Sequence, residues 1–155
     1  MKLTSILKPD CIKVDCRADS REALLTEMVS ELAGMGLVAE DQRVIRKLLE
    51  RESMGSTAIG NHAAVPHTKV HGLPAPIVFI AISRKGIHYS EADKERVHLA
   101  VLILSPTESP IVHLQILAAA ASLIKHSRNL IRDILNADTR EAVVQIIRRN
   151  ENQND

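Results

Sequence analysis

Apolar and polar positions recur with two different periods along this chain, and the two periods predict both strands and helices. Near the start, Cys11-Ile12-Lys13-Val14-Asp15 alternates apolar and polar residues, as a half-buried strand does. Residues 77–82 and 97–104 are nearly continuous apolar runs, which are typical of central strands covered on both faces. Between these runs, Arg84-Lys85-Gly86 predicts a turn.

Apolar residues at helical spacing predict five helices. The first begins at residue 19 and ends at Gly34 or Gly36, and the others cover residues 40–52, 109–125, 130–135 and 142–147. Asp19 stands three residues before Glu22, which predicts an N-terminal capping box for the first helix. Ser109 followed by Pro110 predicts the start of the third helix, which is apolar almost all round. We expect such a helix to pack against the sheet.

Strands interleaved with helices predict an α/β fold, a layered sandwich with a mixed central sheet of about 4–5 strands flanked by helices. The chain has 155 residues, and neither a repeat nor a long linker divides it. This length is typical of one domain. We therefore expect a single domain over residues 1–149, followed by a frayed polar C-terminal tail over residues 150–155.

The composition excludes several classes of protein. Lys and Arg number 20 and Asp and Glu number 19, so the net charge of +1 gives no strong field to attract nucleic acid. Phe79 and Tyr89 are the only aromatic residues, which leaves little for base stacking. Cys11 and Cys16 have no zinc spacing, and no apolar run approaches the ~20 residues of a membrane span. We expect a cytoplasmic protein that does not insert into a membrane.

Seven histidines lie between positions 62 and 126, and His67 has the position best suited to chemistry. An imidazole loses its proton near pH ~6.5, so it can act near neutral pH as a base, a ligand or a nucleophile toward phosphorus. Pro66 restricts the backbone before His67 and presents the ring from a stiff loop at a strand end, where α/β folds collect their sites. The alternative is an exposed loop histidine with no chemical role.

Arg51 and His113 are the other charged or titratable candidates. Arg51 lies along the apolar stripe at the end of its helix, where its guanidinium could hold phosphoryl oxygens or simply complement the helix dipole. His113 follows Ser109 by four residues and should face inward near the positive end of its helix. That position favours a neutral imidazole that donates one N–H to an anion. The alternative is a core histidine bonded to a backbone carbonyl.

The sequence motifs do not predict a metal site or a nucleotide-binding site. His62, His67 and His71 could be considered as metal ligands, but Pro66 and Gly72 interrupt any helix that would align them. No Gly-Lys-Ser or Gly-Lys-Thr follows the glycines of residues 55–60, so a P-loop is absent. We expect no cofactor and no metal.

Several motifs occur together in a fixed order along the chain. They are Leu48-Leu49-Glu50-Arg51-Glu52, Gly55-Ser56-Thr57, Ile59-Gly60-Asn61, Ala64-Val65-Pro66-His67, Leu102-Ile103-Leu104-Ser105-Pro106 and His113-Leu114. Over roughly residues 1–149 this pattern resembles the IIA domains of the bacterial phosphoenolpyruvate-dependent phosphotransferase system, of the fructose, mannitol and nitrogen-regulatory type. The resemblance implies an α/β sandwich that carries a phosphoryl group without a metal or a nucleotide.

The resemblance also implies roles for individual residues. His67 would accept a phosphoryl group on Nε2 from phospho-HPr, or from a nitrogen-type relative of HPr, and pass it to a IIB component. His113 would lie beside it, and Arg51 would line the site. Further candidates for holding the phosphoryl oxygens are Ser56, Thr57 and His62.

Three positions near the predicted site depart from the pattern that the resemblance implies. Ala58, His62 and Thr68 stand where such domains commonly have glycine. His62 is the largest change, since an imidazole there could alter which donor docks or could help to bind the phosphoryl group.

The resemblance supports two functions of different class. The first is a stand-alone IIA phosphocarrier of a mannitol- or fructose-type sugar system, and therefore a phosphotransferase. The second is a nitrogen-type regulatory protein, in which the phosphorylation state of His67 controls binding to other proteins. A weaker third possibility is a relative that has kept the scaffold and lost transfer. The sequence does not identify a sugar, because the membrane component of such systems binds it.

Overall fold

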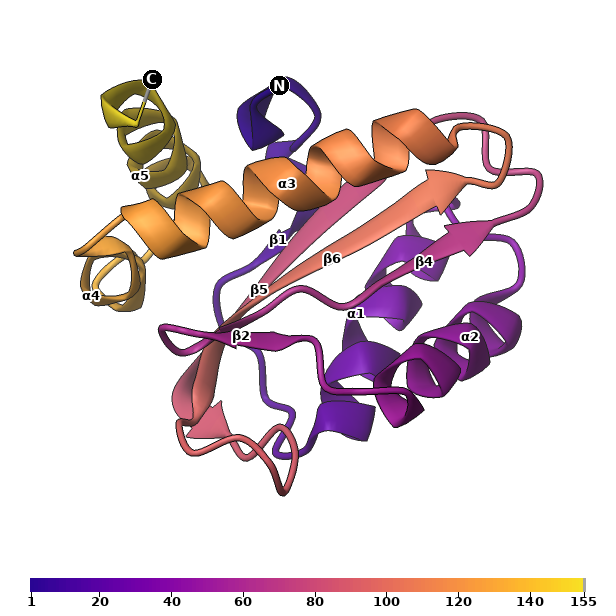
Figure 1. The fold of residues 1–155 in the computed structure, drawn as a ribbon, viewed down its shortest axis with the longest axis horizontal. Helices are drawn as coiled ribbons and strands as arrows, with labels where there is room; N and C mark the ends of the chain where they lie inside the picture. Colours follow the sequence, from indigo (N-terminus) through magenta and orange to yellow (C-terminus); the bar gives the residue numbers. More distant parts are fainter. Residues whose placement is uncertain (155) are drawn as a thin grey trace.

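One mixed sheet lies between two layers of helices in the computed structural model, which describes residues 1–154 (Figure 1). The strands are β1 (Ile12–Lys13), β2 (Ala58–Gly60), β3 (Ala63–Ala64), β4 (His67–Val70), β5 (Ile77–Ile87) and β6 (Val97–Pro106). The α-helices are α1 (Arg21–Gly34), α2 (Asp41–Ser53), α3 (Pro110–His126), α4 (Leu130–Leu135) and α5 (Arg140–Gln153), and two short 3₁₀ turns are η1 (Leu3–Ser5) and η2 (Pro9–Cys11). None of the helices in this part of the chain is long and apolar enough to cross a membrane.

The sheet has both parallel and antiparallel pairs, which confirms the predicted α/β class with a mixed sheet. β5 and β6 form an antiparallel centre, and β1 runs parallel to β5. On the other side of β6, β3 and β4 follow one another along the same edge in parallel register, and β2 pairs with β3. The sheet has six strands, against the prediction of about 4–5. Strands β2, β3 and β4 have four residues or fewer, too few for a periodic pattern to reveal them in the sequence.

Each face of the sheet has its own apolar core. Ile80, Val101 and Ile103 belong to the cluster that packs with α3, α4 and α5. Phe79 and Leu102 point to the other face and pack with α1 and α2. Burial on both faces explains why β5 and β6 are continuous apolar runs, and it confirms their prediction as central strands.

The start of α1 differs by one residue from the predicted capping box. Ser20, not Asp19, is the N-cap, and its Oγ accepts a hydrogen bond of 3.1 Å from the backbone N–H of Ala23. Both residue types cap helices well, and the choice depends on where the backbone first becomes helical. The predicted end at Gly34 is confirmed, and Gly36, two residues later, adopts a positive φ of 77°.

The turn predicted at Arg84-Lys85-Gly86 is wrong, because β5 continues through these residues to Ile87. The pairing of β5 with β6 shifts register between Ile82 and Ile87, and Gly86 has a φ of 81° there. Ser83 Oγ accepts a hydrogen bond of 3.1 Å from Gly86 N. Turns and β-bulges use the same polar and glycine residues, so the local sequence does not separate them.

Gly86→Ala is expected to lower the free energy of unfolding by about 1–3 kcal/mol. A Cβ at this position would lie 2.8 Å from His98 Cε1 and 2.9 Å from Arg96 Cβ, on a backbone that already has a positive φ. Urea unfolding followed by circular dichroism measures the change. Gly34→Ala is the matched control, because nothing lies within 4 Å of its added Cβ, and equal stability of the two variants would contradict the prediction.

The frayed C-terminal tail predicted from residue 150 is wrong over residues 150–154, and Asp155 lies outside the described residues. α5 continues to Gln153, and the Glu151 carboxylate is buried, accepting hydrogen bonds of 2.5 Å from Leu3 N and 2.7 Å from Thr4 Oγ1. Asn154 Nδ2 donates to Ser127 Oγ at 3.1 Å. These partners lie far away in the sequence, so local polarity alone suggested a solvated end.

Candidate functional site

His67 is the first residue of β4, at the point where one short parallel strand gives way to the next along β6. Pro66 stands between β3 and β4, and its carbonyl accepts a hydrogen bond of 2.9 Å from Ile103 N. The backbone therefore stays on the sheet through the proline. His67 was expected on a stiff loop past a strand; the sheet itself holds it instead.

The tautomer of His67 follows from a single contact. Nδ1 lies 2.8 Å from the carbonyl oxygen of Val65. Because a carbonyl only accepts, Nδ1 carries the proton and Nε2 of the neutral ring keeps its lone pair. The ring is half-buried, so it is positioned by the protein without being sealed beneath it.

His113, on the first turns of α3, lies next to His67. The centroids of the two rings are 5.6 Å apart, and their planes are inclined by 54°. His113 is buried, which confirms its predicted inward orientation. Its Nδ1 lies 2.7 Å from Ser105 Oγ, so a side-chain hydroxyl replaces the backbone carbonyl considered as the alternative partner.

Arg51 comes to the same place from the last turn of α2. Its Nη1 donates a hydrogen bond of 2.8 Å to the carbonyl of Gly55, which closes the segment that follows the helix. Its positive charge is among the causes that lower the pKa of His67. The structure thus brings the rings of His67 and His113 together, and the charge of Arg51 reaches His67 from the end of α2.

Both imidazoles of the pair are shifted toward the neutral form. Burial is the main cause that lowers the pKa of His67, and Arg51 adds to it, whereas the Val65 carbonyl and the Glu52 carboxylate act in the opposite direction. Burial also lowers the pKa of His113, with smaller contributions from His67 and Lys69. At neutral pH the site therefore holds two uncharged rings beside a guanidinium.

These shifts predict that the folded state loses stability as the pH falls below about 6.5. The ordinary pKa of histidine is 6.5, and the folded values of His67 and His113 lie lower, so the unfolded chain takes up protons first. Stability is thus fully present above pH 6.5 and declines as the pH falls through the folded pKa values. Urea unfolding between pH 5 and pH 8 measures the slope, and a His113→Gln variant should show a shallower one; an unchanged slope would contradict the prediction.

The hydroxyls of Ser56 and Thr57 are occupied by protein partners. Thr57 is buried, and its Oγ1 donates to Glu52 Oε2 at 2.5 Å and lies 3.1 Å from the Tyr89 hydroxyl. Ser56 Oγ donates to Asp93 Oδ2 at 2.8 Å. The structure therefore places both hydroxyls in contacts that fix the loop, and it does not direct them at His67.

His62 is not brought to His67 either. Its carbonyl accepts from His98 N and Leu99 N, whereas His67 pairs with Ile103 farther along β6. At ~3.3 Å per residue this places the two backbones more than ~10 Å apart. His62 Nδ1 lies 3.0 Å from the Arg96 carbonyl, and Nε2 lies 3.4 Å from a Glu95 carboxylate oxygen. Across residues 1–154, no three His, Cys, Asp or Glu side chains are grouped in a way that could hold a metal ion.

Sequence reasoning missed a buried carboxylate directly after Arg51. Glu52 is 3% exposed and accepts three hydrogen bonds, from Thr57 N at 2.8 Å, Thr57 Oγ1 at 2.5 Å and Tyr89 OH at 2.9 Å. Burial and the nearby Glu52 raise the pKa of Tyr89 strongly, so its hydroxyl stays protonated and donates. One signal was present, since Glu52 follows Leu48 by four residues and so falls on the apolar stripe of its helix.

The fold, with two imidazoles and a guanidinium at one edge of its sheet, is of the kind that the sequence motifs led us to expect. The chain belongs to the family described as "Phosphoenolpyruvate-dependent sugar phosphotransferase system, EIIA 2", which it matches over residues 5–150. This confirms the resemblance noted from the sequence.

The similar proteins include nitrogen regulatory proteins and components of sugar phosphotransferase systems. The chain is 32% identical to the nitrogen regulatory protein of Escherichia coli (strain K12) over 149 residues, which are 95% of this chain and 90% of that protein. It is 29% identical to the PTS system fructose-specific EIIABC component of Bacillus subtilis (strain 168) over 147 residues, 95% of this chain. The match spans only 23% of that Bacillus protein's length.

Solved structures support the same fold. The nitrogen regulatory protein IIA-Ntr of Neisseria meningitidis superposes with a TM-score of 0.82 at 22% identity, covering 94% of this chain and 98% of that one. The IIA mannitol protein of Escherichia coli gives a TM-score of 0.75 at 19% identity, covering 91% and 98%. At these identities the likeness shows the fold alone.

Proposed function

We propose that this protein carries a phosphoryl group on Nε2 of His67, accepting it from phospho-HPr or a nitrogen-type relative and passing it to a IIB component. One observation carries the proposal: the Nδ1 hydrogen bond to Val65 leaves the lone pair of Nε2 free, in a ring held 5.6 Å from His113. A solved complex of the Escherichia coli IIA mannitol enzyme with its phosphorylated IIB partner, whose IIA fold matches with a TM-score of 0.75, supports a IIB acceptor.

The transfer needs positioning and charge compensation more than covalent help. The bond from Nε2 to phosphorus forms as the bond from phosphorus to the donor breaks, and the electron pair leaves with the donor. The ring of His67 then gains positive charge, which strengthens the Nδ1–H hydrogen bond to the Val65 carbonyl. The Arg51 guanidinium offsets the charge of the phosphoryl oxygens.

His113 is suited to donate to the transferred group. When the hydroxyl of Ser105 donates to His113 Nδ1 across their 2.7 Å contact, the ring proton is on Nε2. The lowered pKa keeps the ring neutral, so it offers one N–H without adding a full charge. We therefore assign His113 to hold a phosphoryl oxygen and Ser105 to orient the ring.

Incubation with phosphoenolpyruvate, enzyme I and HPr tests the proposal. We expect one acid-labile phosphoryl group per chain, located on His67 by mass spectrometry of the peptide at neutral or basic pH. No incorporation, or incorporation on another histidine, would overturn the assignment. Replacing HPr by its nitrogen-type relative in a parallel reaction identifies the donor.

An apolar surface beside the site suits a protein partner. Ile111 and Leu114 share one face of the α3 turn that carries His113, and they are 70% and 65% exposed. Leu114→Glu is expected to raise the KM for the phosphorylated donor about tenfold, because a central apolar contact is commonly worth 1–2 kcal/mol. Steady-state phosphorylation kinetics measure this effect. Leu37→Glu, another exposed leucine at 38%, is the control, and an equal KM in both variants would contradict the prediction.

A regulatory role is the second candidate, and the identity to nitrogen regulatory proteins favours it. Besides the Escherichia coli protein, that of Pseudomonas aeruginosa is 30% identical over 95% of both chains. Affinity capture with wild type, His67→Ala and the phosphate-mimicking His67→Asp separates the two roles. A regulator should retain a partner that distinguishes these forms, whereas a transport carrier should not.

A further inference from the structure

The α3–α4 connection, α4 and α5 border an open cationic cavity of about 570 Å³ that plays no part in the proposed phosphoryl transfer. Its charged lining consists of three arginines and one aspartate, Arg128, Arg132, Arg149 and Asp133, beside an imidazole, His126. Three guanidinium groups against one carboxylate give a local excess of positive charge, although the whole chain has a net charge of only +1. The remaining lining is polar, with the amide side chains of residues 129, 150 and 153.

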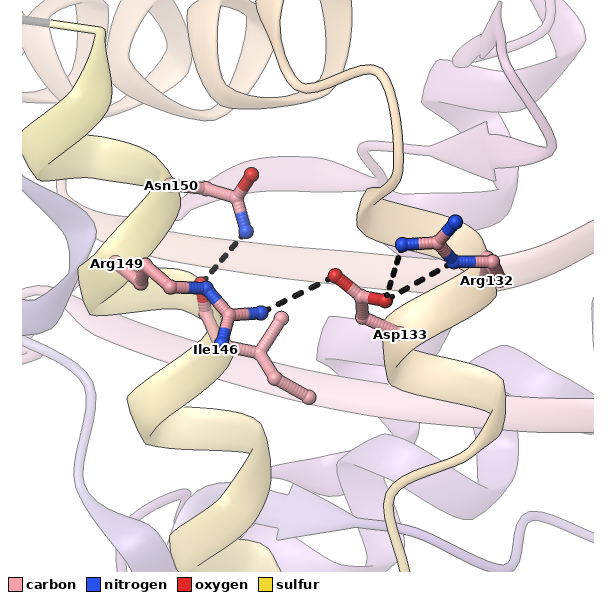
Figure 2. A network of polar contacts seen from close by, with 5 residues as sticks. All are labelled: Arg132, Asp133, Ile146, Arg149 and Asn150. Carbon is pink, nitrogen blue, oxygen red and sulfur yellow. Dashed lines mark hydrogen bonds and ion pairs between the residues drawn. The ribbon is translucent and has the colours of Figure 1, made fainter.

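Asp133 holds two of the guanidinium groups in place, as Figure 2 shows. Its Oδ1 accepts from Arg132 Nε and Nη2, both at 3.2 Å, and its Oδ2 accepts from Arg149 Nη2 at 3.1 Å. The Asp133 side chain is only 23% exposed, so the carboxylate lies between α4 and α5 while the two arginines remain more than half exposed. Each guanidinium has five N–H groups, and most of them stay available to a ligand.

Arg128 contributes the third guanidinium of the cavity lining. Within residues 1–154 it makes neither a hydrogen bond nor an ion pair, and it is exposed on the connection between α3 and α4. Because no carboxylate in the described part of the chain neutralises Arg128, its positive charge is available to an anionic ligand.

A second cavity of about 460 Å³ shares the lining residues 126–128 with the first and extends the cationic surface. Lys125 and His62 line it together with Arg128. Position 62 was expected to be glycine in a domain of this type. In the structure its histidine lines the second cavity and does not lie beside His67. The histidine at position 62 therefore adds an imidazole to the cationic surface that Lys125 and Arg128 form.

We propose that the cavity between the α3–α4 connection and α5 binds a small phosphorylated ligand. A guanidinium fork matches the oxygens of a phosphate group in geometry and charge, which an array of lysines would not do. The volume falls within the range of ~300–1,000 Å³ that is common for small-molecule sites. Recognition is of the phosphate and not of a base, because the chain's two aromatic side chains, Phe79 and Tyr89, are both buried in the core.

Titration calorimetry of the full chain with inorganic pyrophosphate tests this proposal. We expect Arg128→Gln and Arg149→Gln each to weaken pyrophosphate binding about tenfold or more, since each removes a charge-assisted contact. Arg148→Gln is the matched control: Arg148 neighbours Arg149 on α5 and is exposed, but it lines neither cavity, so binding should change less than about twofold.

Several outcomes would overturn the proposal. They are absence of binding by the wild type, an unchanged affinity in Arg128→Gln, or an equal loss in Arg148→Gln, which would indicate a diffuse field. Because Arg128 has no protein partner within residues 1–154, its replacement leaves the fold intact and keeps the test decisive even where Arg149→Gln disturbs Asp133. Citrate, a polycarboxylate, is the comparison ligand, because guanidinium groups also pair with carboxylates; tighter binding of citrate than of pyrophosphate would refute a phosphate site.

Discussion

Replacing His67 by glutamine is expected to reduce phosphoryl acceptance from the phosphorylated donor at least about 10³-fold. Glutamine preserves a polar side chain that can hydrogen-bond to the Val65 carbonyl, so the strand start is disturbed little. It has no nitrogen lone pair that can attack phosphorus. The initial rate of label transfer from the donor, measured under single-turnover conditions, gives the effect.

Two other histidines serve as controls for that measurement. His71 lies four residues further on with an 80% exposed side chain, and His71→Gln should be phosphorylated at the wild-type rate. His113→Gln should slow acceptance about 10–100-fold but leave the label on His67, because in our proposal its ring holds a phosphoryl oxygen and does not attack phosphorus. Wild-type labelling of His67→Gln would show that another residue accepts the phosphoryl group.

The parts of the fold that sequence reasoning predicted are those that local periodicity encodes. Burial on two faces produces the apolar runs of β5 and β6, and the amphipathic stripe of α2 fixes which residues face the sheet. The last turn of α5 consists of polar residues, so the sequence suggested a solvated tail. In the structure Glu151 is buried there against Leu3 and Thr4, at the other end of the chain. Burial of a carboxylate by such distant partners leaves no local signal.

The same division applies to the candidate site. Pro66-His67 and the inward position of His113 follow from backbone restriction and helical spacing, and the structure brings the two rings together. The hydroxyl of Thr57 was a candidate for contact with the phosphoryl group, and its orientation could not be read from the sequence. That orientation depends on Glu52 and Tyr89, which the chain brings together only on folding.

Glu52→Ala is expected to lower the free energy of unfolding by about 3–5 kcal/mol. The substitution removes a buried acceptor and leaves the Thr57 N–H, the Thr57 hydroxyl and the Tyr89 hydroxyl without their shared partner. It also releases the loop at Gly55, to which Arg51 is bonded, so the guanidinium beside His67 loses its anchor. Urea unfolding followed by circular dichroism measures the stability, and the rate of phosphoryl acceptance measures the effect on the site.

Glu52→Gln separates the loss of hydrogen bonds from the loss of charge. Its amide oxygen can still accept from Thr57 N, and both hydroxyls can rotate to accept from the amide N–H groups, so about 1 kcal/mol should be lost. The Gln variant also removes the negative charge that raises the pKa of His67, so that pKa should fall further. The acid limb of phosphoryl acceptance should then move to lower pH while the loop stays ordered. Equal stability of the Ala and Gln variants would mean that the three hydrogen bonds do not hold the loop, whereas an unmoved acid limb would mean that the charge of Glu52 does not reach His67.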